Sequence, residues 1–182
     1  DTEASGVELV SGFNHANKCM WLTVQSELKT IKKFSDLIES WEQVAIAVWW
    51  AKDKMKTIKE MSAKLPENVT MVVFWALANA FRIAQWKKMG DSVYIKEDVI
   101  LAKEILDSGR EIILPEQYII AQKTEISKGN FVYWEWFKIS SNEDIEAWYA
   151  CCDSSEEAIL EILKVLKKKW VKAMMMNGTV WI

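Results

Sequence analysis

The chain has 182 residues, of which 51% are hydrophobic and 27% are charged, and its formal net charge is -3. This length suits one domain with a substantial core, and the composition excludes an intrinsically disordered chain. The longest apolar runs, residues 44–51 and 71–78, fall short of the ~18 residues that a membrane-spanning helix needs. A slightly acidic, mixed charge gives no general attraction for nucleic acid. We therefore expect neither nucleic acid nor a membrane as a partner.

Two further counts bear on location and on the fold. Three cysteines without a framework spacing, and no basic-then-apolar leader, favour a cytoplasmic location. Eleven tryptophans stand beside only six glycines, although average usage predicts about thirteen glycines in a chain of this length. The places where glycine is missing are therefore informative.

Helical and strand-like segments alternate along the chain after an irregular N-terminal stretch that ends at about residue 16. Helical periodicity and continuous apolar runs predict, in order, helix 26–38, strand 44–48, helix 52–65, strand 69–73 and helix 76–86, closed near Gly90. The second half continues with helix 96–106, one interrupted or two short strands at 112–114 and 118–121, strand 131–139, helix 156–166 and a last run at 171–176. Ser155 and the two glutamates after it are typical of a helix N-terminus.

This alternation predicts βαβ units. We expect a single α/β domain over residues 1–182, with a three-layer, Rossmann-like architecture and a mostly parallel sheet of about four strands. Ligands of such sheets bind at the carboxyl ends of the strands, where glycine-rich turns let backbone amides approach phosphates.

The segments after the first two predicted strands resemble the C-terminal, nucleotide-binding domain of phosphoglycerate kinase. Residues 48–52 read Val-Trp-Trp-Ala-Lys where the family has a strand followed by Gly-Gly-Ala-Lys. Residues 73–81 read Val-Phe-Trp-Ala-Leu-Ala-Asn-Ala-Phe where it has Gly-Gly-Gly-Met-Ala-Asn-Thr-Phe after a strand. Four later segments follow in the family's order: 90–93 (Gly-Lys-Ser-Leu), 112–115 (Leu-Leu-Pro), 145–153 (Ile-Pro-x-Gly-Trp-x-Gly-x-Asp) and 171–178 (a strand ending in Trp-Asn-Gly-Pro).

The resemblance implies a nucleotide site. Lys52 matches the lysine of Gly-Gly-Ala-Lys, and the next family lysine matches either Lys54 or Lys56. Asn177 and Gly178 keep their places beside the nucleotide. If this cleft survives, the implied ligand is Mg-ADP or Mg-ATP, and the implied activity is a phosphoglycerate kinase-like phosphoryl transfer.

The departures from the family argue against that activity. Trp49, Trp50, Phe74, Trp75 and Ala76 replace glycines that must admit a ligand and can require positive φ. The family's magnesium-site aspartate and its substrate domain have no counterpart in these 182 residues. We therefore expect no catalytic residues, no metal and no bound cofactor, and a stable scaffold that is inactive alone.

Glycines overwritten at every ligand-facing turn suggest the hypothesis of a designed or redesigned sequence, which would be recombinant rather than cytoplasmic. Two alternatives remain open. The chain could retain weak ADP or ATP binding, or it could bind apolar ligands or itself through the strand-end tryptophans.

Other candidate sites receive structural interpretations. Cys151 and Cys152 are interpreted as small core residues rather than a redox or metal pair, and His15 as a surface residue. Trp134 and Trp136 alternate along a predicted strand, so we expect both on one face, in core or interface packing. If exposed together with Trp181, they would favour self-association.

Overall fold

The computed structural model describes residues 22–49 and 54–177. The chain divides into two units, residues 1–36 and 37–182. The described part of the first unit belongs to helix α2 (Leu22–Glu39), which confirms the helix predicted over residues 26–38. Among the described residues, no helix combines the length and the apolar character that a membrane span requires.

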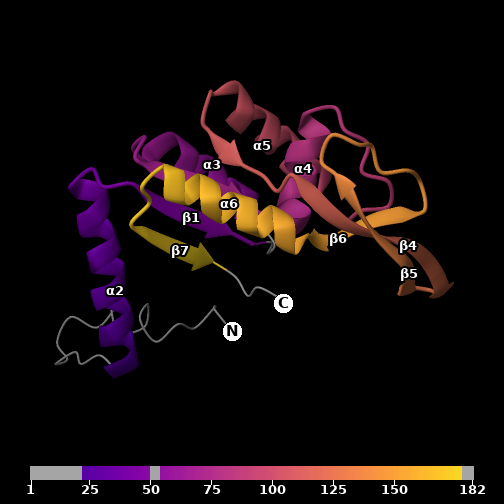
Figure 1. Ribbon diagram of the computed structural model, residues 1–182, viewed down its shortest axis with the longest axis horizontal. Coiled ribbons are helices and arrows are strands. Elements are labelled where there is room, and N and C mark those ends of the chain that lie inside the picture. The colour runs from indigo at the N-terminus through magenta and orange to yellow at the C-terminus, as the bar shows by residue number, and fades with distance from the viewer. Residues whose placement is uncertain (1–21, 50–53, 178–182) are drawn as a thin grey trace, which may run out of the picture. The chain divides into compact units, whose positions relative to one another are not determined.

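A parallel sheet forms the centre of the second unit (Figure 1). Its strands are β1 (Val44–Val48), β2 (Val69–Val73), β3 (Ile112–Ile113) and β7 (Ala173–Asn177), in the order β3-β2-β1-β7. All three pairings are parallel. Every residue of β1 and β2 is buried, as their uninterrupted apolar sequences predict.

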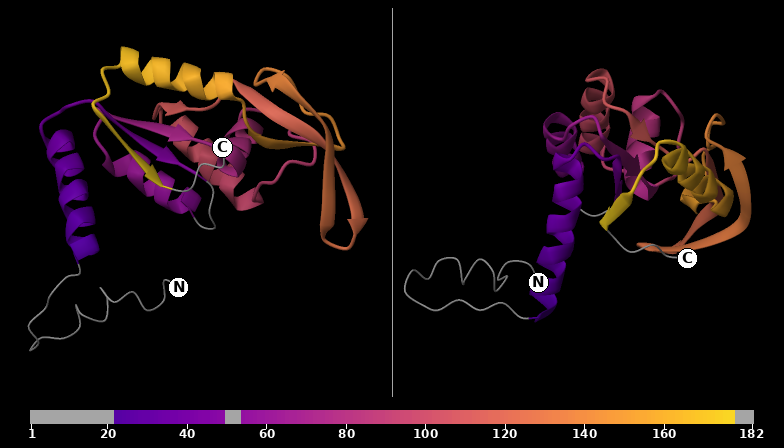
Figure 2. Two further views of the ribbon diagram at one scale, coloured as in Figure 1. Left: turned by 60° about the horizontal axis from the view of Figure 1, so that its bottom comes forward. Right: turned by 60° about the vertical axis from the view of Figure 1, so that its left-hand side comes forward.

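Helices cover both faces of this sheet (Figure 2). Helix α6 (Glu156–Lys168) lies on one face, where Ile162 and Leu166 pack with alternate residues of β1 and β2. Helices α3 (Lys54–Lys64), α4 (Trp75–Ala84) and α5 (Lys96–Asp107) lie on the other. The predicted α/β fold with a mostly parallel sheet is confirmed.

A second sheet was not foreseen. Strands β4 (Gln117–Ser127), β5 (Asn130–Ser140) and β6 (Tyr149–Ser154) form an antiparallel sheet in the order β5-β4-β6. The predicted strands at 112–114 and 118–121 are therefore two strands in different sheets. Residues 145–153, whose family motif implies a loop, contain most of β6.

A β-bulge in β5 overturns the expected alternation of two tryptophans. Glu135 has a φ of 52° and the register shifts between Ile120 and Gln122 of β4. Trp134 donates a hydrogen bond from Nε1 to Thr124, whereas the ring of Trp136 lies 6.2 Å from that of Tyr133. Tyr133 and Trp134 are neighbours in the strand and therefore point to opposite faces. Since Trp136 lies beside Tyr133, Trp134 and Trp136 lie on different faces of the hairpin.

Candidate functional site

The carboxyl ends of the parallel strands meet at one edge of the sheet. Val48 ends β1 and pairs with Val73 of β2 on one side and with Asn177 of β7 on the other. Helix α4 starts directly after β2, so its N-terminus lies at the same edge. This edge is where ligands of parallel α/β sheets bind, and it is the edge that the sequence motifs indicate.

The described residues of the expected site have different positions. Lys54 begins α3, and its Nζ donates a hydrogen bond to the carbonyl of Trp49 over 3.1 Å. Lys56 follows in the same turn and is exposed. Asn177 ends β7. Lys52, Gly178, Trp50 and the side chain of Asn177 lie outside the described residues.

Aromatic side chains fill the space beside the ends of β1 and β2. The rings of Trp49 and Phe74 stack with centroids 4.2 Å apart and planes 16° from parallel. Both side chains are buried and belong to the cluster that packs on α6. They therefore continue the face of the sheet on which alternate residues of β1, such as Ala45 and Ala47, contact this helix.

The cavity left between this aromatic pair and α6 is small. Its volume is about 70 Å³, whereas sites for nucleotide-sized ligands span roughly 300–1,000 Å³. It is lined by apolar side chains alone, namely Ala47, Trp49, Val72, Phe74, Ile159, Ile162, Leu163, Met174 and Met176. Across the described residues, no group of three or more His, Cys, Asp or Glu could hold a metal ion. On this face of the strand ends, the described side chains leave no space of nucleotide size.

The N-terminus of α4 lacks a cap of its own. Phe74 occupies the N-cap position without a side-chain hydrogen bond, and the first turn contains no acidic residue. Trp75, the first helical residue, has a φ of 52°. The positive end of the helix dipole is consequently uncompensated by this helix's own side chains.

Asn79, which the sequence shares with the family motif, is almost fully buried. Its Nδ2 donates a hydrogen bond to the carbonyl of Val93 over 2.9 Å, and its Oδ1 has no partner among the protein atoms. Asn79 therefore ties α4 to the segment that precedes α5, a role that the sequence motif did not reveal.

The adjacent cysteines have the structural character expected from the sequence. Cys151 is buried, and this burial raises the pKa of its thiol far above the usual range. Burial also raises the pKa of Cys152, which is half-buried. Because the thiolate is the reactive form, both shifts favour the structural interpretation of the two cysteines.

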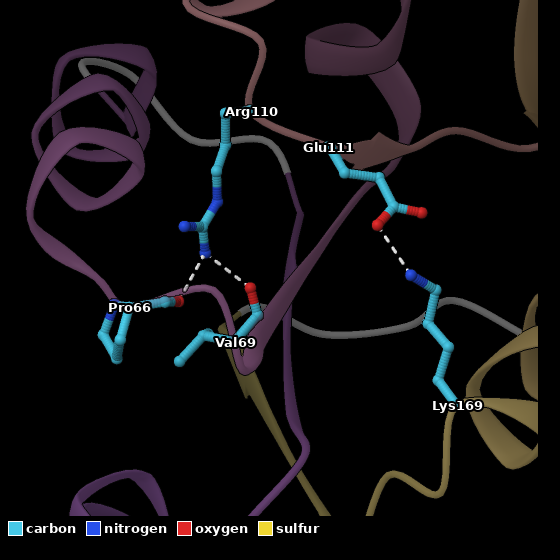
Figure 3. Close-up of polar contacts among 5 residues, drawn as sticks. All are labelled: Pro66, Val69, Arg110, Glu111 and Lys169. Atoms are coloured by element: carbon cyan, nitrogen blue, oxygen red, sulfur yellow. Dashed lines mark hydrogen bonds and ion pairs between the residues drawn. The ribbon is translucent and has the colours of Figure 1, made fainter. Parts of the chain in front are cut away.

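A cavity of about 650 Å³ lies at the opposite edge of the sheet, and most of the charged groups that line it have partners. The guanidinium of Arg110 donates hydrogen bonds to the carbonyls of Leu65, Pro66 and Val69. Lys169 pairs with Glu111 at 2.6 Å, as Figure 3 shows. These contacts join segments of the fold, and we assign this cavity no ligand.

Comparisons with known proteins agree with the fold. The model of the family described as phosphoglycerate kinase matches residues 3–181. The phosphoglycerate kinase of Coxiella burnetii superimposes with a TM-score of 0.59 and 15% sequence identity, over 85% of this chain. The chain spans 39% of the length of that enzyme. No curated protein matches the sequence.

Proposed function

Since the chain belongs to the phosphoglycerate kinase family, we propose that, with the sequence as written, it is the scaffold of that family's nucleotide-binding half and has no phosphotransferase activity alone. The observation that carries this proposal is the stack of Trp49 on Phe74. It leaves about 70 Å³ of apolar space on the α6 face of the strand ends. Phosphoryl transfer depends on positioning and charge stabilisation, which such a cavity does not supply.

Residual binding of Mg-ADP or Mg-ATP is the second candidate. Lys54 and Lys56 lie in the first turn of α3, where the helix dipole disfavours cations. The uncapped N-terminus of α4 lies at the same edge. Both features favour an anion there, and together they support weak binding of phosphate groups.

A titration distinguishes the two candidates. Thermal unfolding and tryptophan fluorescence are measured with and without millimolar Mg-ADP. The inactive-scaffold proposal predicts no change in either signal, because a ligand raises the unfolding midpoint only if it binds the folded state. A saturable shift would contradict that proposal. If that shift then disappeared in Lys54→Ala but persisted in Lys64→Ala, at the other end of α3, the binding site would be the edge formed by the carboxyl ends of the strands.

Self-association is a separate candidate, supported by strand β5. It is one of the two edge strands of the antiparallel sheet, and its residues from Asn130 to Lys138 are exposed. An exposed, apolar edge strand is a template for pairing with another chain. We propose a second copy as its partner, because β5 carries one acidic and one basic residue, Glu135 and Lys138, and Lys138 already pairs with Glu157 of its own chain. Two copies of β5 therefore do not repel each other.

Sedimentation equilibrium tests this candidate. The mass of the chain is expected to rise with concentration, and Trp136→Lys on β5 is expected to reduce the rise. Trp86→Lys serves as the control, because Trp86 is 87% exposed and lies outside the strands. A monomer mass at all concentrations, or equal effects of the two variants, would overturn the pairing.

A further inference from the structure

Five tryptophans share a backbone conformation that disfavours tryptophan. Within the described residues, six non-glycine residues have φ in the left-handed region, and all but Glu135 are tryptophans. They are Trp41 (59°), Trp75 (52°), Trp86 (68°), Trp148 (78°) and Trp170 (58°). An L-residue in this conformation lowers the folding equilibrium constant by roughly 5–30-fold, whereas glycine adopts it freely.

Three of these tryptophans end helices in one specific hydrogen-bond pattern. The amide of Trp86 donates to the carbonyl of Ile83, and that of Lys87 donates to Arg82. This is the Schellman motif, in which the residue at the position of Trp86 is usually glycine. The same two bonds close α2, where the amide of Trp41 donates to the carbonyl of Ile38 and that of Glu42 to the carbonyl of Leu37. They also close α6, where the amide of Trp170 donates to the carbonyl of Lys167 and that of Val171 to the carbonyl of Leu166.

Helix α5 provides an internal comparison. The amide of Gly109 donates to the carbonyl of Leu106, as at the other three helix ends, and its φ is 77°. Here the chain has glycine at the position where Trp41, Trp86 and Trp170 stand in the other helices. Packing does not account for those three indoles, since they are 68%, 87% and 82% exposed.

The remaining two positions also correspond to glycines. Trp75 lies in the turn between β2 and α4, within the segment that resembles the family's glycine triplet. Trp148 follows Ile145 by three residues, as the first glycine follows isoleucine in the Ile-Pro-x-Gly motif. The positive φ and the position in the motif therefore both indicate glycine at residues 75 and 148.

We propose that these tryptophan positions are glycine positions of the functional protein, and that the codon written as tryptophan is decoded as glycine in the cell of origin. The codon UGA, a stop signal in the standard genetic code, is read as tryptophan in some genomes and as glycine in others. One such codon accounts for an excess of tryptophan and a deficit of glycine in the same chain. Decoding this codon as glycine would also make residues 49–52 read Gly-Gly-Ala-Lys, the motif of the family.

The backbone part of the proposal is tested on the full chain by stability. Trp86→Gly and Trp86→Ala both remove the exposed indole, but only glycine relieves the positive φ. We expect glycine to exceed alanine in folded-to-unfolded ratio by about threefold to fivefold, once the greater freedom of glycine in the unfolded chain is included. Equal stability, or an advantage for alanine, would overturn the inference.

Trp136 supplies the matched control. It is an exposed tryptophan without a positive φ, and glycine weakens a strand. Trp136→Ala is therefore expected to be more stable than Trp136→Gly, the reverse of the order at residue 86. This readout involves no nucleotide, so its failure is distinct from a failure of the proposed function.

The decoding is tested on the gene and on the native protein. UGA is expected at the codons of Trp41, Trp75, Trp86, Trp148 and Trp170, and UGG at these positions would overturn the decoding. In the protein from its own cells, the tryptic peptide of residues 83–87 is expected to have the mass of Ile-Ala-Gln-Gly-Lys. The mass of the tryptophan-containing peptide would refute the proposal.

Discussion

Replacing Arg110 with leucine is expected to lower the free energy of unfolding by about 3 kcal/mol. The guanidinium donates to the carbonyls of Leu65 over 2.9 Å and of Pro66 over 3.2 Å, and it also contacts the carbonyl of Val69. A hydrogen bond that involves a charged group contributes about 1.5–3 kcal/mol, and part of this is recovered here because water reaches the half-buried site. Urea denaturation measures the change.

The neighbouring ion pair in Figure 3 is the control for Arg110. Glu111→Gln removes the charge that pairs with Lys169, but the side chain of Glu111 is 63% exposed. An exposed pair contributes about 0–1 kcal/mol, so this variant is expected to be nearly as stable as the parent. Equal losses in the two variants would show that Arg110 acts only as a surface charge.

The parallel sheet could be predicted because its strands are apolar without interruption. Residues 44–48 and 69–73 are buried at every position, and continuous apolar runs between helices are typical of strands covered on both faces. The antiparallel sheet could not be predicted in the same way. Strand β5 itself was predicted over residues 131–139, but it is exposed along most of its length and the bulge at Glu135 breaks the period-two pattern of a half-buried strand. No apolar face therefore indicated which strand it pairs with.

Helix ends were less predictable for a different reason. Gly90 was expected to close the helix after β2, because tryptophan is not a stop signal. The structure ends α4 at Ala84 and places Trp86 in the left-handed region. Trp86 argues against the hypothesis of a designed sequence, since a sequence chosen for local fit would have glycine at this position.

Motif order indicated the carboxyl ends of β1 and β2 as the candidate site, but the motifs did not predict where the side chain of Trp49 lies. This side chain packs against α6. The alternation of side chains along β1 is the signal that could have predicted the position of Trp49. Ala45 and Ala47 face α6, so the residue two positions later faces the same helix.

Alkaline pH is expected to destabilise the fold through two buried acids. Burial raises the pKa of Tyr118 from 10.0 to about 12, although nearby Arg82 opposes the shift. Burial likewise raises the pKa of Cys151 well above its usual range. Both groups are neutral in both states at neutral pH. Above about pH 9 the unfolded chain ionises first, so stability is lost as the pH rises toward about 12.

The contribution of Tyr118 to this loss is about 2–3 kcal/mol, from a shift of about two pKa units at 1.36 kcal/mol each. Urea denaturation at intervals between pH 8 and pH 11 is expected to show a falling free energy of unfolding. The double variant Tyr118→Phe, Cys151→Ala removes both ionisable groups. Its stability at pH 8 is expected to be lower, because Arg82 loses the hydrogen bond from its Nε to the phenol, but its decline with pH is expected to be shallower. Only the parent has these two buried acids. An equal fall of the free energy of unfolding with pH in the parent and in the variant would therefore contradict their ionisation as the cause.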